Sequence, residues 1–140
     1  MAHCLLHLYR LLKLTLMTNE NIRLLLVDDN EINSLFAGIM FNKLNIPFDV
    51  ACNKSQALGL IEKNTYSLVL LDIQMPIHDG YDIAKEIRSI DSKLPIIAFT
   101  SLPEEQVLPK AIDSGMNEYL LKPSAMQELR SILDRYKASA

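Results

Sequence analysis

Short apolar runs recur along the chain, separated by longer stretches in which apolar residues return every three or four positions. The runs have the length of strands: Ile22–Val27, Phe48–Ala51, Leu68–Leu71, Ile96–Phe99 and Tyr119–Leu121. The central runs are continuously apolar, which is typical of strands buried on both faces of a parallel sheet. The pattern therefore predicts five strands of one sheet.

The stretches between the runs have the period of an α-helix. Apolar residues fall on one helical face at Ile32, Leu35, Phe36, Ile39, Met40 and Leu44, then at Ala57, Leu58 and Ile61, then at Ile83, Ala84, Ile87 and Ile90, and two more helices are marked by Ile112 and by Leu129, Ile132, Leu133 and Tyr136. Strands that alternate with helices predict an α/β fold, a doubly wound parallel sheet covered on both faces with right-handed crossovers.

Polar residues mark the expected helix starts. Asn30 or Asn33 can cap the first helix, Asn53 the second, Asp79 the third and Ser124 the last. Pro109 falls inside the expected fourth helix, where it removes a hydrogen bond. We expect it to kink that helix or to delay its start.

The first residues differ from the rest. Residues 5–16 are strongly apolar but are interrupted by His7, Arg10 and Lys13, and they are too short to span a bilayer. They also lack the basic start and the small-residue cleavage site of a secretory signal. We therefore treat residues 1–20 as an extension, either an amphipathic helix that docks on a membrane or a partner or a non-native addition, with Met17 as the natural start. Residues 21–140 form a single domain.

Composition narrows the function only slightly. The chain has 140 residues and a net charge of −3, which gives no basic footprint for a nucleic acid. Its cysteines, Cys4 and Cys52, do not have the spacing of a metal site. Free thiols in a reducing compartment are the simpler interpretation, so we expect a cytoplasmic protein with no membrane span and no direct nucleic-acid contact.

The residues that end the runs carry the chemistry. The first run ends in Asp28 and Asp29, the third in Asp72, the fourth in Thr100 and the fifth in Lys122. In a parallel sheet these carboxyl ends meet at one edge, where ligands bind. Adjacent carboxylates at the end of a buried strand repel each other, so we expect a partner that relieves the repulsion.

The residue types suggest what that partner is. Three carboxylates form a hard oxygen site that suits Mg²⁺, an ion that retains waters for a phosphate group. A carboxylate can also attack phosphorus to give an aspartyl phosphate, while Lys122 supplies a positive charge for phosphoryl oxygens and Thr100 a hydroxyl donor. Asp72, on a central strand, is the candidate acceptor.

Four pieces together resemble the receiver domain of response regulators: VDD at 27–29, LLDIQMPIHDG at 70–80, FTS at 99–101 and YLLKP at 119–123. The opening DDNEIN and the MPIHDG loop are most similar to receiver modules of hybrid histidine kinases. The resemblance covers roughly residues 22–138. It implies a flavodoxin-like, five-stranded sheet of order 2-1-3-4-5.

The resemblance also implies roles for individual residues. Asp72 matches the phosphorylated aspartate, Asp29 the direct Mg²⁺ ligand and Asp28 a helper that acts directly or through water. The main-chain carbonyl of Gln74 matches a further metal ligand. Lys122 matches the lysine that is characteristic of the family, and the Pro123 that follows it suggests a cis peptide bond.

Two residues match the family's conformational switch. Thr100 corresponds to the hydroxyl that moves toward the phosphoryl group, and Tyr119 to the aromatic side chain that turns inward in response. The implied function is a phospho-acceptor module, not a turnover enzyme, which takes a phosphoryl group from a histidine kinase or a histidine phosphotransfer protein. The downstream effector is not identified by the sequence.

Other functions remain as alternatives. A phosphatase of the haloacid-dehalogenase type also combines an aspartate nucleophile with Mg²⁺, but it needs a second aspartate where this chain has Gln74. A flavodoxin-like flavin binder needs a phosphate loop in place of the acidic DDNEIN. A receiver-like module that only binds would not need the complete set of acids, threonine and lysine. The chain fits either a stand-alone regulator or a piece of a hybrid kinase, and the second is favoured.

Overall fold

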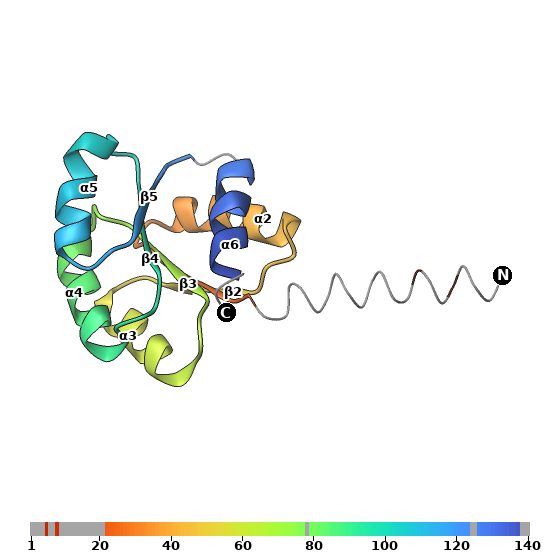
Figure 1. Ribbon diagram of the computed structural model, residues 1–140, viewed down its shortest axis with the longest axis horizontal. Coiled ribbons are helices and arrows are strands. Elements are labelled where there is room, and N and C mark those ends of the chain that lie inside the picture. Colours follow the sequence, from red (N-terminus) through yellow and green to blue (C-terminus); the bar gives the residue numbers. More distant parts are fainter. Residues whose placement is uncertain (1–4, 6–7, 9–21, 78, 124–125, 138–140) are drawn as a thin grey trace.

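The computed structural model describes residues 5, 8, 22–77, 79–123 and 126–137 (Figure 1). Strands and helices alternate through this part of the chain. In order they are β1 (Leu24–Val27), α2 (Glu31–Lys43), β2 (Phe48–Ala51), α3 (Lys54–Lys63), β3 (Leu68–Leu71), α4 (Gly80–Ile90), β4 (Ile96–Thr100), α5 (Glu104–Asp113), β5 (Glu118–Leu121) and α6 (Met126–Lys137).

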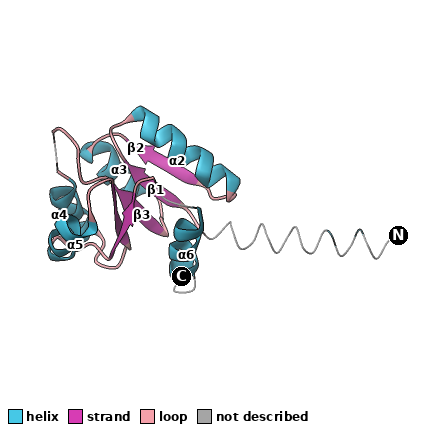
Figure 2. Ribbon diagram, turned by 90° about the horizontal axis from the view of Figure 1, so that it is seen from above, coloured by secondary structure: helices cyan, strands magenta, loops and turns pink. Residues whose placement is uncertain are grey.

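The five strands form one parallel sheet of order β2-β1-β3-β4-β5, which confirms the predicted fold class. Successive side chains of a strand point to opposite faces, and the core divides accordingly. Leu25 and Val27 of β1 belong to one hydrophobic cluster, which α3, α4 and α5 cover. Leu24 and Leu26 belong to another cluster, which α2 and α6 cover (Figures 1 and 2).

Helix α2 packs on the sheet through a face that shares only Met40 and Leu44 with the face that the apolar periodicity picks out. Ala37, Gly38 and Phe41 are its buried residues. The small side chains at 37 and 38 let the helix lie close to the sheet, and a Cβ atom at Gly38 would be 3.1 Å from the ring of Phe48. The larger apolar residues on the other side of α2 are therefore left exposed: Ile32, Leu35, Phe36 and Ile39.

The predicted caps agree with the structure where it describes them. The side chain of Asn30 accepts hydrogen bonds from two backbone amides at the start of α2, while Asn53 and Asp79 each accept one at the starts of α3 and α4. Asn30, not Asn33, is therefore the first cap. Ser124 and residues 9–20 lie outside the described residues, as do most of residues 1–8.

Pro109 does not delay the start of α5, contrary to one of the two expected effects. The helix begins at Glu104, ahead of the proline, and Pro109 lies within it. One missing amide hydrogen costs a single helical hydrogen bond, whereas Val107 and Ala111 on either side are fully buried and hold both halves of the helix on the sheet. Among the described residues, no helix is long and apolar enough to cross a membrane.

Candidate functional site

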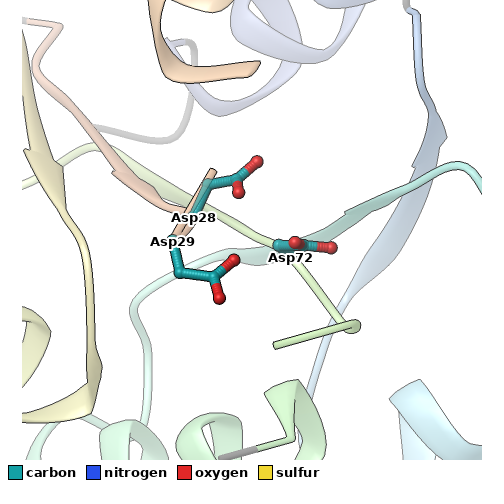
Figure 3. Close-up of side chains that lie close together, drawn as sticks. All are labelled: Asp28, Asp29 and Asp72. Atoms are coloured by element: carbon teal, nitrogen blue, oxygen red, sulfur yellow. The ribbon is translucent and has the colours of Figure 1, made fainter. Parts of the chain in front are cut away.

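Three acidic side chains meet at the carboxyl edge of the sheet, as the strand ends predicted. Asp28 and Asp29 directly follow β1, and Asp72 directly follows the neighbouring strand β3 (Figure 3). Each offers a carboxylate oxygen, and these oxygens lie within 4.8 Å of one another. Asp28 and Asp72 are buried, with 1% and 6% of their surface exposed, whereas Asp29 is open to solvent.

Lys122 directly follows the edge strand β5 and reaches the acid cluster from that edge of the sheet. Its Nζ lies 2.5 Å from Oδ2 of Asp28 and 3.7 Å from Oδ1 of Asp72. The ammonium group also lies over the ring of Phe99, 5.1 Å from the centroid. Its peptide bond to Pro123 is cis, as predicted. The lysine is therefore paired most closely with Asp28 and is within reach of Asp72.

Backbone amides fix two of the carboxylates. The amide of Asn30 donates to Oδ1 of Asp28 at 2.9 Å, and the amide of Gln74 donates to Oδ1 of Asp72 at 3.1 Å. Both bonds turn the chain sharply after a strand, which aims the carboxylate back over the strand end. The local sequence thus orients the acids before any ligand is considered.

The surroundings of Asp72 disfavour the ionised form of its carboxyl group. Burial raises the pKa of its carboxyl from the ordinary value of 3.8 to about 6. The positive charge of Lys122 opposes this shift, and the negative charge of Asp28 adds to it. A carboxyl group with such a pKa beside other acids is typical of a functional site.

Gly80 supports the site and was missed as such by the sequence reasoning. A Cβ atom at this position would lie 2.5 Å from the carbonyl oxygen of Asp72 and 2.8 Å from Cα of Ile73. Only glycine lets the first turn of α4 approach the backbone that carries Asp72, and the Gly80 amide donates to the Ile73 carbonyl at 3.1 Å. In the sequence, the Asp-Gly pair at 79–80 is the signal for this requirement, but there it serves only as part of the MPIHDG motif.

A cavity of about 470 Å³ opens over the acid cluster. Its lining combines acids, amides and apolar side chains: Asp29, Asn30, Asn33, Phe36, Ala37, Met40, Asp72, Gln74, Phe99, Ser101, Lys122 and Pro123. The lining thus includes Asn33, Phe36, Ala37 and Met40 of α2 and Ser101 of the loop after β4. A group of phosphate size fits into this space beside Asp72.

Thr100 and Tyr119, the predicted switch residues, are joined through one loop residue and not directly. Thr100 ends β4 and is fully buried, and its Oγ1 accepts a hydrogen bond from the Leu102 amide at 3.3 Å. The hydroxyl of Tyr119 donates to the carbonyl oxygen of the same Leu102. Neither Thr100 nor Tyr119 lines the cavity, and Ser101 is the loop residue that does.

The donor set fits a hard divalent cation. Three carboxylates lie close enough together to share one ion, and at an effective dielectric constant of 20 two such charges repel by roughly 3 kcal/mol. Oxygen donors of this kind match Mg²⁺, which binds through one or two carboxylates and keeps coordinated waters. A cation in the acid cluster would offset the repulsion from Asp28, which adds to the rise in the Asp72 pKa that burial causes.

Comparison with known proteins gives a consistent family. Residues 24–134 match the response regulator receiver domain. The chain is 34% identical over 122 residues to the transcription factor SKN7 of Saccharomyces cerevisiae, covering 87% of this chain and 20% of that protein. It is 30% identical to histidine kinase 5 of Arabidopsis thaliana over 142 residues, covering 81% and 15%. The chain thus spans a fifth or less of these relatives.

Solved structures agree with the sequence relatives. The receiver domain of a sensor histidine kinase from Pseudomonas aeruginosa, with a magnesium ion coordinated in the active-site cleft, aligns with a TM-score of 0.76 and 32% identity and covers 84% of this chain and 98% of its own. The receiver domain of Ssk1 from Saccharomyces cerevisiae, crystallised with the histidine phosphotransfer protein Ypd1, gives 0.75 and 27% and covers 84% and 89%. From its fold, its site and these matches, the chain belongs to the response regulator receiver domain family, a component of two-component and phosphorelay signalling.

Proposed function

We propose that Asp72 accepts a phosphoryl group from a phosphohistidine, with Mg²⁺ held by Asp28, Asp29, Asp72 and the main-chain carbonyl of Gln74. The observation that carries the proposal is the convergence of three carboxylates and one ammonium group at the carboxyl edge of the sheet, where Asp29, Asp72 and Lys122 line one cavity. An acid–lysine set of this kind supplies both an attacking oxygen and a counter-charge for phosphoryl oxygens.

The proposed transfer is a simple displacement at phosphorus. An oxygen of the Asp72 carboxylate forms the new O–P bond as the N–P bond to the donor imidazole breaks, and the electron pair of that bond stays on the imidazole nitrogen. When bound, Mg²⁺ supplies charge neutralisation for the carboxylates and the phosphoryl oxygens. Lys122 lies 3.7 Å from Asp72, so its ammonium group is placed to bind a phosphoryl oxygen there.

The proposed switch involves Thr100 and Tyr119. A phosphoryl group on Asp72 offers acceptor oxygens to which the Thr100 hydroxyl can donate. Movement of Thr100 would disturb its bond with the Leu102 amide, and the Leu102 carbonyl holds the Tyr119 hydroxyl. The two side chains are therefore coupled through Leu102, and the phosphoryl group shifts the balance between two packings of this edge.

The proposed chemistry also indicates which proteins would act as partners. A histidine kinase or a histidine phosphotransfer protein would supply the phosphoryl group, since the similar Ssk1 receiver was crystallised with such a transfer protein. The parent protein would be a hybrid kinase or a regulator, as the relatives include both kinases and a transcription factor. We place the module in the cytoplasm, where the exposed free thiol of Cys52 remains reduced.

A haloacid-dehalogenase-type phosphatase is not favoured, because such an enzyme needs a proton donor two residues after its nucleophile. That position is Gln74, whose backbone amide donates to the Asp72 carboxylate and whose side chain cannot act as a general acid. We therefore propose a switch that assists its own phosphorylation and dephosphorylation and has no substrate that it turns over.

The experiment uses acetyl phosphate as donor. Incubation of the chain with acetyl phosphate and Mg²⁺ is expected to add one phosphoryl group by intact mass spectrometry, and chelation of Mg²⁺ to prevent it. Asp72→Asn should abolish the labelling, whereas Asp134→Asn, on the exposed side of α6, should leave it unchanged. Labelling of the Asp72→Asn protein at the native level would reject the assignment.

A further inference from the structure

The ammonium group of Lys122 has two kinds of contact, which differ in how much of its charge they leave available. Its Nζ lies 2.5 Å from Oδ2 of Asp28, and it also lies over the ring of Phe99, 5.1 Å from the centroid. A carboxylate neutralises the ammonium charge, whereas the face of an aromatic ring attracts a cation through its quadrupole and carries no net charge. A lysine that is held by the ring therefore keeps its charge for another ligand.

The sheet places the ring and the lysine on the same face. Phe99 of β4 is in register with Leu120 of β5, and both belong to the hydrophobic cluster that α2 and α6 cover. The backbone amide of Lys122 donates to the Thr100 carbonyl at 2.8 Å, which continues the pairing of these strands up to the site. Lys122 follows Leu120 by two residues, so the alternation of side chains directs it to the same face. The contact with the ring thus follows from strand register.

Burial strengthens this contact. The Lys122 side chain exposes 13% of its surface and Phe99 exposes 7%, so little water lies between the ammonium group and the ring. A cation over an aromatic ring is held more strongly where both groups are desolvated. The other cation–ring contacts among the described residues are longer, at 5.5 Å and 5.9 Å. In this part of the chain, Phe99 therefore makes the closest contact of this kind.

The lysine needs such a support because its side chain is flexible. A four-carbon stem joins Nζ to the backbone, and holding it in one conformation costs rotamer entropy. Any ligand that neutralises Asp28 weakens the ion pair at 2.5 Å, and the ammonium group is then less restrained from turning into solvent. Phe99 lines the same cavity as Lys122 and still attracts the cation there. The ring thus favours the conformations that keep Nζ within reach of Asp72, which is 3.7 Å away.

We propose that Phe99 is a positioning residue, whose ring face holds the charged amine of Lys122 beside Asp72 for the phosphoryl oxygens. The inference rests on the proposed phosphoryl transfer and adds the group that keeps Lys122 in the cavity. Phe99 itself takes no part in making or breaking bonds. Position 99 requires an aromatic ring with an electron-rich face, and a large apolar side chain is not sufficient.

Fluorination of the ring tests the electrostatic attraction while the shape is nearly retained. Replacing Phe99 with 4-fluoro-, 3,5-difluoro- and 3,4,5-trifluorophenylalanine withdraws progressively more electron density from the ring face. We expect labelling by acetyl phosphate and Mg²⁺ to slow in that order, by about three- to thirtyfold for the trifluoro ring, which is a cation–π attraction expressed as a ratio of rates. The same series at Phe41, a buried ring of the same cluster with no cation over it among the described residues, should leave the rate unchanged.

Urea denaturation in a chelator gives a readout that needs neither metal nor phosphoryl transfer. Lys122→Met keeps most of the stem and removes the charge. The trifluoro ring at position 99 should lower the folding equilibrium constant at least about threefold more in the protein with Lys122 than in Lys122→Met, which a double-mutant cycle isolates. Nuclear magnetic resonance supplies a second measurement if Lys122→Met does not fold. The ring current of Phe99 should shift the Lys122 Cε protons upfield, and Phe99→Leu should remove that shift.

The outcomes separate this inference from the proposed function. Equal effects of the trifluoro ring in both backgrounds, or no upfield shift of the Lys122 protons, would overturn the role of Phe99. So would an unchanged labelling rate across the Phe99 series when the native protein is labelled, and so would equal slowing at Phe41, which assigns the effect to packing. Absence of labelling in the native protein itself would reject Asp72 as the acceptor, and the role of Phe99 in the transfer with it.

Discussion

Removing the charge of Asp72 should stabilise the metal-free protein, although it removes the proposed acceptor. Asn has the shape of Asp and keeps an oxygen to accept the Gln74 amide, which now lies 3.1 Å from Oδ1 of Asp72. What the Asp72→Asn variant loses is a negative charge that is 94% buried beside Asp28. A functional site that holds like charges together does so at the expense of folding stability.

The size and the pH dependence of the effect follow from the pKa. Burial raises the pKa of Asp72 from 3.8 to about 6, and since one pKa unit is about 1.36 kcal/mol, the ionised form costs the folded state roughly 3 kcal/mol. Between these pH values the unfolded chain has already lost its proton while the folded protein retains it. Native stability therefore falls as the pH rises from about 4 to about 6, and the full cost is present above pH 6.

Urea denaturation of both proteins in a chelator, at pH values from 4 to 7.5, measures the difference. We expect Asp72→Asn to equal the native protein near pH 4 and to exceed it by about 1–3 kcal/mol at pH 7. Saturating Mg²⁺ should offset this difference, because ligand at 100 times its Kd adds about 2.7 kcal/mol to the native protein. Asp113→Asn, on the exposed end of α5, should show no such pH dependence. A variant that is equally stable or less stable at pH 7 without metal would refute the reasoning.

The other predictions concern the supports of Asp72. Gly80→Ala places a methyl group 2.5 Å from the Asp72 carbonyl oxygen. We therefore expect the free energy of unfolding, measured by urea denaturation, to fall by about 1–3 kcal/mol and labelling by acetyl phosphate to be slower. The control Gly59→Ala lies in α3 with nothing within 4 Å of the new Cβ atom, and it should be neutral or stabilising by up to about 1 kcal/mol. Equal effects at both glycines would contradict this. Lys122→Ala leaves Asp28 buried without its partner at 2.5 Å, so it should lower the stability of the metal-free protein by about 3 kcal/mol. The variant should still bind Mg²⁺ in calorimetry but should be labelled poorly by acetyl phosphate. Normal labelling would remove Lys122 from the mechanism.

The strand ends could be placed from sequence because two independent signals coincide there. Continuous apolar runs fix where a buried parallel strand lies, and the first polar residue after each run fixes where it stops. Asp28, Asp72 and Lys122 are such residues, and parallel strands bring their ends to one edge. The strand limits differ by at most two residues, since β1 starts at Leu24 where Ile22 was expected.

What sequence could not give depends on distances between backbones. The face of α2 that packs on the sheet contains Ala37 and Gly38, and the periodicity of large apolar residues favours a face that overlaps it only at Met40 and Leu44, because the periodicity ignores small residues. The need for glycine at position 80 appears only when α4 is placed against the backbone of Asp72. The pairing of Lys122 with Asp28, closer than with Asp72, likewise depends on how β5 is placed relative to β1.

That pairing bears on the order of events in the proposed transfer. The Lys122 ammonium group divides its charge between Asp28, at 2.5 Å, and a phosphoryl oxygen bound at Asp72. A cation shared by the acid cluster competes with the ammonium group for the Asp28 carboxylate, because both neutralise the same charge. Metal binding would thus free Lys122 for the phosphoryl group. Mg²⁺ and phosphate analogues such as beryllofluoride should therefore bind with positive coupling in the native protein, and in Lys122→Ala that part of the coupling should be lost, which calorimetry with each ligand in either order can measure.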